Sequence, residues 1–218
     1  RNSTSGARQK LDASSTSGLQ PRWRQCRKCC CGVLTSWAVF LGSLGVSFVG
    51  LVALESSQVF GGRSGNRMLS LPYMIAVGMG LHNLGEGLAI GASYASGEYT
   101  LSALLVAGFG LHNGTEGFGI VGAAGKTPMS WRDVFLLGLI AGLPTCVGTF
   151  LSGQGVSSYF SICFYALAAG SLLYVVLSLT VMSYTATRRV QVAAGMFAGI
   201  SLMYVTAMVL TLVSGVRS

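Results

Sequence analysis

The chain contains two histidines, and each heads the same short pattern with a glutamate four residues later. The pattern reads GLHNLGEG at 80–87 and recurs as GLHNGTEG at 110–117, 30 residues further on. Its side chains with metal-binding chemistry are His82, Asn83, Glu86, His112, Asn113 and Glu116. These six residues are the candidate site of the protein.

The spacing predicts that each histidine and its glutamate share one face of a helix, because residues four apart lie one turn apart. Each asparagine is rotated by about 100° and flanks that face. A short connection around Glu98 makes the two segments antiparallel neighbours, so that both faces can converge. Two imidazoles and two carboxylates suit Zn²⁺, Fe²⁺ or Mn²⁺, and the lack of a thiolate argues against Cu⁺. A second cation could share the two glutamates and take both asparagine oxygens as ligands.

Two other interpretations of the repeat stay open at this point. A buried His–Glu pair can be a structural lock that only joins side chains. Chains of histidine and glutamate can also carry protons without a metal.

The elements that position the repeat are predicted from composition. Only 14 basic and 6 acidic residues occur in 218, and 51% of the residues are hydrophobic. Charged residues make up about 25% of soluble domains, so 9% is too few to cover a surface in water. Apolar stretches long enough to cross a bilayer lie at about 33–54, 71–96, 100–124, 133–152, 159–182 and 191–213. Because the backbone must satisfy its own hydrogen bonds in lipid, we predict an all-α, polytopic membrane bundle of about six transmembrane helices.

Residues 1–32 are predicted to be a disordered basic tail, and residues 33–218 a membrane domain. The tail carries a cysteine cluster (Cys26, Cys29, Cys30 and Cys31) that suits either acylation or capture of a soft metal. Four pairs of glycines spaced for close helix packing are Gly87/Gly91, Gly110/Gly114, Gly138/Gly142 and Gly195/Gly199. Pro144 is expected to kink its helix or leave a gap in its hydrogen bonding.

The basic residues of the loops predict the orientation of the helices. Three loops on one face carry Arg63, Arg67, Lys126, Arg132, Arg188 and Arg189. The positive-inside rule places these loops in the cytoplasm. The basic residues before the first apolar stretch conflict with this orientation, so either that stretch does not span or sequence upstream of Arg1 resolves the conflict. The +8 net charge therefore indicates topology, and nucleic acid is not expected as a partner.

At these residues the chain resembles the ZIP (Zrt-/Irt-like) divalent-metal transporters, in particular prokaryote-type members with two HNxxEG motifs. The resemblance covers about residues 70–213 and includes HNLGEGLAIG at 82–91, HNGTEG at 112–117, GLPTCVGTFLSG at 142–153 and AAGSLLYVV at 168–176. It implies an eight-helix fold whose first two helices are either missing here or lie upstream of Arg1. It also implies a transport site made of the six motif residues, and movement of Zn²⁺, Fe²⁺, Mn²⁺ or Cd²⁺ toward the cytoplasm.

The chain departs from this family in two places besides its helix number. Many members have proline before the motif glutamate, where this chain has Gly85 and Thr115. Members also carry an acid on the seventh helix that completes a second metal site, whereas the corresponding stretch, VLSL at 176–179, has none.

The predicted function is secondary transport of divalent cations, Zn²⁺ first and Fe²⁺ or Mn²⁺ next, with the ion as substrate and no cofactor. The expected location is a multi-pass protein of the cell membrane, with lipid as its surroundings and a homodimer as a candidate assembly. Two rivals remain: an intramembrane zinc metalloenzyme, and a metal sensor or degenerate transporter that does not transport. The enzyme is disfavoured because the helices offer no ionisable group beyond the motif to act as a spare acid or base.

Overall fold

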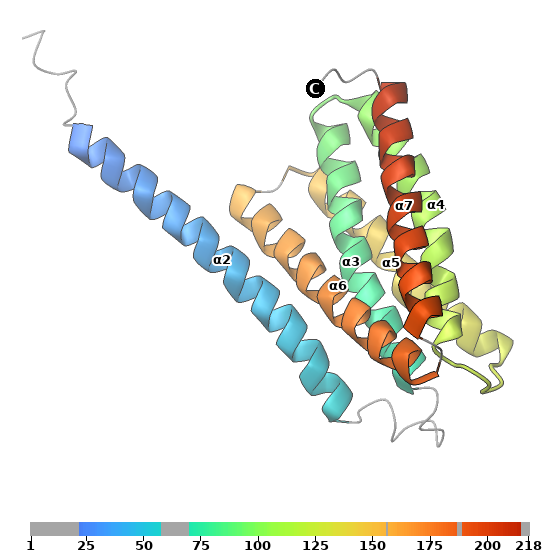
Figure 1. Cartoon of the computed structure of the whole chain (residues 1–218). Helices are drawn as coiled ribbons and strands as arrows, with labels where there is room; N and C mark the ends of the chain where they lie inside the picture. Colours follow the sequence, from blue (N-terminus) through green and yellow to red (C-terminus); the bar gives the residue numbers. More distant parts are fainter. Residues whose placement is uncertain (1–21, 58–69, 156, 187–188, 215–218) are drawn as a thin grey trace, which may run out of the picture. The chain divides into compact units, whose positions relative to one another are not determined.

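The chain is all-α. The computed structural model describes residues 22–57, 70–155, 157–186 and 189–214, and these contain helices and no strand. The helices are α2 (Arg22–Ser56), α3 (Ser70–Ala95), α4 (Tyr99–Gly122), α5 (Trp131–Gly153), α6 (Ser158–Ala186) and α7 (Arg189–Ser214) (Figure 1). The predicted all-α, polytopic bundle is therefore confirmed, and each predicted apolar stretch corresponds to one helix.

Two compact units divide the chain inside α2, at Val39 and Phe40. In the first unit, α2 begins at Arg22, about ten residues before the apolar stretch and within the segment predicted to be a disordered tail. The remainder of that tail, residues 1–21, lies outside the described residues, as do the side chains of the cysteine cluster. Of the basic loop residues, Arg63, Arg67 and Arg188 also lie outside them. The candidate site lies wholly in the second unit.

Four of the described helices are long and apolar enough to cross a membrane: α2 from Gly32, and α5, α6 and α7 over most or all of their lengths. Helices α3 and α4 have 26 and 24 residues, enough to span about 30 Å of hydrocarbon at about 1.5 Å per residue. They are less apolar because the two polar motifs lie in their middles. With several apolar helices of this length, the chain is an integral, multi-pass membrane protein.

Helix α3 is the centre of the second unit and packs against α4, α5 and α6 (Figure 1). Its closest neighbour is α5, because glycines remove the side chains between the two backbones. A methyl group on Gly87 or Gly91 would collide with the backbone of α5 at Thr145 or Thr149. Likewise, a methyl group on Gly148 of α5 would collide with the backbone of α3. This mutual fit lets the two helices pack backbone to backbone.

Hydrogen bonds add to the α3–α5 contact near the beginnings of both helices. The Tyr73 hydroxyl donates to Asp133 Oδ1 at 3.0 Å. Asp133 also forms a capping box with Ser130, whose hydroxyl accepts from the Asp133 backbone N–H at 3.2 Å. One carboxylate therefore both caps α5 and joins it to α3.

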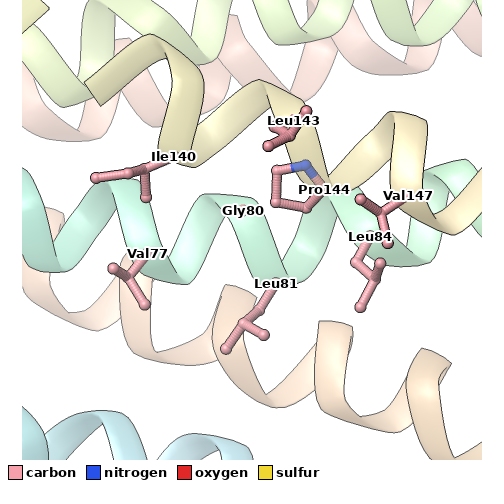
Figure 2. Close-up of a pocket in the computed structure, with 8 residues that line it drawn as sticks. All are labelled: Val77, Gly80, Leu81, Leu84, Ile140, Leu143, Pro144 and Val147. Carbon is pink, nitrogen blue, oxygen red and sulfur yellow. The ribbon is translucent and has the colours of Figure 1, made fainter. Parts of the chain in front are cut away.

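Pro144 leaves a gap in the hydrogen bonding of α5, as the sequence predicts, because proline has no N–H for the Ile140 carbonyl. Gly80 of α3 packs at this point: a methyl group on it would lie 2.5 Å from the Ile140 oxygen and 3.2 Å from the proline ring. An apolar pocket of about 310 Å³ lies beside this contact. Figure 2 shows the residues that line it: Val77, Gly80, Leu81, Leu84, Ile140, Leu143, Pro144 and Val147.

A tight turn makes α3 and α4 antiparallel neighbours. Gly97 supplies the positive φ of 81° that the turn needs. Beyond the turn, the Ser102 hydroxyl of α4 donates to the Ile90 carbonyl of α3 at 3.3 Å. This bond fixes the register in which the two motif copies face each other.

The remaining contact of α3 is with α6. Gly78 and Gly85 lie against Val175 and Ala168, at distances that leave no room for a methyl group. The fully buried Tyr174 packs in the same cluster, together with Met74 and Ile75 of α3. Helix α3 is therefore enclosed on three sides, and its polar motif is held in the interior.

The prediction of four close-packing glycine pairs is correct only for Gly87/Gly91. Among the described residues, no atom lies within 4 Å of a methyl group built on any glycine of the other three pairs. Spacing alone does not decide the matter, because a glycine helps packing only where its helix face meets another backbone.

We predict that Gly87→Ala destabilises the protein by about 1–3 kcal/mol, the usual cost of overpacking. The added methyl group has to displace the backbone of α5, which a side-chain rotation cannot avoid. The measurement is the thermal midpoint of the purified protein in detergent.

Gly195→Ala is the matched control, since no described atom lies near the position of its new methyl group. It should leave the midpoint unchanged or raise it, because alanine is the better helix former by about 1 kcal/mol. Equal midpoints for the two variants would contradict the close α3–α5 contact.

Candidate metal centre

The two copies of the motif meet between α3 and α4. Within α4, His112 Nε2 lies 2.9 Å from Glu116 Oε1. Within α3, His82 Nε2 lies 3.7 Å from Glu86 Oε1. Across the helices, the same Glu86 oxygen lies 3.7 Å from His112 Nε2, and the two imidazole rings are 6.3 Å apart. The one-turn spacing in the sequence therefore places both pairs on facing sides of adjacent helices.

Three of these side chains have the geometry of a metal-binding group. His82, Glu86 and His112 each offer a ligand atom, and the three atoms all lie within 4.8 Å of one another. Zn²⁺ binds histidine nitrogen and carboxylate oxygen at about 2.0–2.2 Å, so small side-chain movements would bring all three atoms onto one ion. Glu116 lies beside this group, in contact with His112.

The site is buried, and among the described residues its acids form no ion pair with a lysine or arginine. Glu86 is 7% exposed, and the side chain of Glu116 is 12% exposed. In the described part of the chain, histidines are the only residues that form ion pairs with these two acids. With neutral imidazoles, both carboxylates would lack a compensating cation, which is costly at membrane depth. A bound divalent cation would supply that charge.

Four oxygen atoms of the site have no hydrogen-bond partner among the described residues, although they are buried. They are Asn83 Oδ1, Glu86 Oε2, Asn113 Oδ1 and Glu116 Oε2. A buried oxygen without a partner costs about 1–3 kcal/mol, and more when it is charged. These oxygens belong to all four of the acids and amides in the repeated motif. Oxygen is the ligand atom that a hard divalent cation prefers.

The asparagines differ in how they are held. Asn83 is 2% exposed, and its amide donates to the Ala141 carbonyl of α5 at 3.1 Å. That bond fixes the carboxamide and leaves its oxygen free. Asn113 interacts with the Glu86 carboxylate of the opposite helix. Each asparagine therefore supports a different part of the site, although the motif is the same.

Two contacts behind the histidines could not be predicted from the sequence. The ring of His82 interacts with the backbone carbonyl of Ala168 in α6. His112 Nδ1 lies 3.0 Å from Met203 Sδ in α7. A backbone carbonyl leaves no trace in residue types, and methionine is ordinary in an apolar helix. These contacts bring α6 and α7 to the site.

All six predicted residues lie at this site. His82, Glu86 and His112 form the compact group, Glu116 pairs with His112, and the asparagines flank the acids. Their roles as metal ligands stay a prediction.

Comparison with known proteins finds one curated relative of clear similarity. Zinc transporter ZIP4 of Homo sapiens is 34% identical over 131 residues, which cover 58% of this chain and 20% of the human protein. The chain thus spans about a fifth of the length of the relative it matches. No family profile matches the chain, and no solved structure does. The similarity indicates distant homology to a zinc transporter of the ZIP type.

We predict that Glu86→Gln lowers the affinity of the purified protein for Zn²⁺ by about tenfold or more, since even loss of an outer partner of a metal ligand costs about 10–100-fold. The substitution keeps the size of the side chain and removes the charge of a carboxylate that lies 3.7 Å from each of the two histidines. Competition with a fluorescent zinc indicator in detergent measures the affinity.

Glu98→Gln is the matched control, because this acid lies exposed in the α3–α4 turn. It should bind Zn²⁺ like the wild type. Equal affinity of Glu86→Gln and wild type would show that the group at Glu86 is not a metal site.

Proposed function

We propose that this chain belongs to the ZIP family and carries the transport site of a secondary transporter for divalent metal cations. The observation that supports this most is the set of four buried, unpartnered oxygens beside two imidazoles. A structural lock would satisfy these oxygens within the protein. The four oxygens are better explained as ligands for a metal ion.

The proposed site binds its ion by replacing part of the hydration shell. His82, Glu86 and His112 provide the first three ligands, and Glu116 or an asparagine oxygen provides the next. The two carboxylates neutralise the ion while it is at membrane depth. Binding has to be moderate, because an ion that is held too tightly cannot leave.

The imidazole and carboxylate ligands of the site indicate which class of cation is transported. Two imidazoles with carboxylates suit Zn²⁺, and also Fe²⁺ and Mn²⁺. Zinc is our first choice because the similar human protein is a zinc transporter. The ion is substrate, and the proposal involves no cofactor.

The packing suggests which helices would move together during transport. Helices α3 and α5 are joined backbone to backbone by glycines and by the Tyr73–Asp133 and Asn83–Ala141 hydrogen bonds. We therefore treat these two helices as one rigid group. Transport would follow from rocking of helix groups against each other around the fixed site.

The loop charges support the proposed orientation of the helices, and the ZIP resemblance supports the direction of transport. Lys126 and Arg132 lie at the connection between α4 and α5, which the positive-inside rule places in the cytoplasm. We propose uptake toward the cytoplasm across the cell membrane. A homodimer remains a prediction.

One rival has a specific feature in its favour. The segment 176–179 of α6 carries no acid, although the ZIP resemblance leads us to expect one. A metal sensor or degenerate transporter would retain the His/Glu group and lose transport. An intramembrane zinc enzyme would additionally require a substrate-sized cavity at the metal and a spare acid or base.

The test is metal accumulation in cells that express the complete gene, measured by mass spectrometry for Zn²⁺, Fe²⁺ and Mn²⁺. We expect uptake above the vector control for wild type, and a return to the vector level for His82→Ala and Glu116→Ala. Each substitution removes one ligand from a different copy of the motif.

Glu98→Ala controls for the loss of an acid outside the site and should transport normally. Surface expression of every variant is measured in parallel. No uptake by a wild type that binds Zn²⁺ would favour the sensor, and uptake untouched by both substitutions would refute the proposed site.

A further inference from the structure

Helix α7 reaches the candidate metal centre through one thioether. Met203 Sδ lies 3.0 Å from Nδ1 of His112, whereas Nε2 of the same ring faces Glu116 at 2.9 Å and Glu86 at 3.7 Å. His112 is therefore held from both sides, with carboxylates at one nitrogen and sulfur at the other.

The chemistry of the thioether decides which way the hydrogen bond runs. Methionine sulfur is a weak acceptor and has no hydrogen to donate. A favourable contact at this distance consequently requires a hydrogen on Nδ1, with the ring N–H donating to Sδ. Nε2 lies 2.9 Å from Glu116 Oε1, which requires a hydrogen between these two atoms while no ion is bound. When an ion takes the place of that hydrogen, the hydrogen on Nδ1 stays with Sδ and the Nε2 lone pair binds the ion.

We propose that Met203 is a positioning residue, whose sulfur accepts the Nδ1–H of His112 and thereby directs the Nε2 lone pair toward the ion site. The inference rests on the proposed function, since it concerns a ligand of that same site. Ligating histidines generally donate their second ring N–H to an acceptor, which fixes the ring orientation and the nitrogen that binds metal.

The other histidine has a backbone group as its second neighbour. The ring of His82 interacts with the backbone carbonyl of Ala168 in α6, which no substitution can remove. His112 depends instead on a side chain from α7. The two histidines thus take their second partners from two different helices, and only the partner of His112 can be altered without changing the backbone.

The test begins with Zn²⁺ binding by the purified full chain in detergent, for wild type, Met203→Leu and Met203→Gln. Leucine has a similar volume and no acceptor, and Met203 is 41% exposed, so the substitution should cost little packing. We expect Met203→Leu to bind Zn²⁺ about tenfold more weakly, the low end of the range for such partners. Glutamine supplies an amide oxygen at a similar reach and should restore wild-type affinity.

Met208→Leu is the matched control. It lies on the same helix and is 54% exposed, but it is turned by about 140° from Met203 around α7. Its affinity for Zn²⁺ should equal that of the wild type. A loss as large as that of Met203→Leu would mean that any change in α7 disturbs the site, and would overturn the assignment.

A second measurement tests the hydrogen bond of the His112 ring directly. The chain contains two histidines, so ¹⁵N-histidine labelling gives two imidazole signals in the NMR spectrum of the Zn²⁺-loaded protein. We expect the Nδ1–H of His112 to be protected from solvent exchange in wild type and Met203→Gln, and to exchange faster in Met203→Leu. Unchanged exchange in Met203→Leu would overturn the proposed hydrogen bond.

The outcomes separate this inference from the function on which it rests. A wild type that fails to bind Zn²⁺ would refute the metal site as a whole. Zn²⁺ binding by wild type with equal affinity in Met203→Leu would refute only the role of Met203. Weaker binding of Cd²⁺ alone, with Zn²⁺ unchanged, would identify the sulfur as a direct soft ligand and would also overturn the positioning role.

Discussion

The structure depends on a carboxylate that is almost fully buried among membrane helices. Glu86 is 7% exposed, and within the described residues its ion-pair partners are two histidines, each at 3.7 Å. Removing a carboxylate from water costs several kcal/mol even after the protein relaxes. The interaction with two imidazoles at this distance offsets only part of that free-energy cost. The surrounding helices therefore have to hold the acid in place against its tendency to reach water.

The packing of α3 provides that support. Glycines on α3 and α5 bring the two backbones together, and the Asn83 amide binds the α5 backbone at Ala141. Because the helices meet through backbone atoms, the contact has few flexible side chains that could yield. The polar face of α3 is consequently directed toward α4, where the second motif lies. The tight contact of α3 with α5 and the direction of its polar face toward α4 are two consequences of one arrangement.

The sequence allows the helices and the core of the site to be predicted, because both follow from simple periodicities. Apolar stretches of about 20 residues have to be helices in lipid, and histidine and glutamate four residues apart share a face. The turn around Glu98 is short enough to make the two motif helices neighbours. These patterns are local in the sequence, and they are enough to predict that the six motif residues lie close together.

Long-range packing could not be predicted in the same way. The close contact of α5 with α3 depends on Gly148, which belongs to none of the predicted pairs, and three of the predicted pairs meet no neighbour among the described residues. The acceptor for His82 is a backbone carbonyl, and the acceptor for His112 is a methionine 91 positions away. Nothing in residue type or spacing distinguishes these partners from ordinary apolar positions.

The same packing makes the two copies of the motif physically unequal. Along α3 most residues around His82 are buried, whereas α4 has three buried residues, Ser102, Gly108 and Ile120. A methyl group on Gly110, Gly114 or Gly117 of α4 would meet no described atom. Moving α4 away from α3 would separate His112 and Glu116 from Glu86 while breaking a much smaller contact than the one between α3 and α5. Moving α3 would require the glycine contact with α5 to open. In the proposed transport, an ion held between these helices would be bound by one rigid half and by one half that is easier to displace, which is what release from a buried site requires.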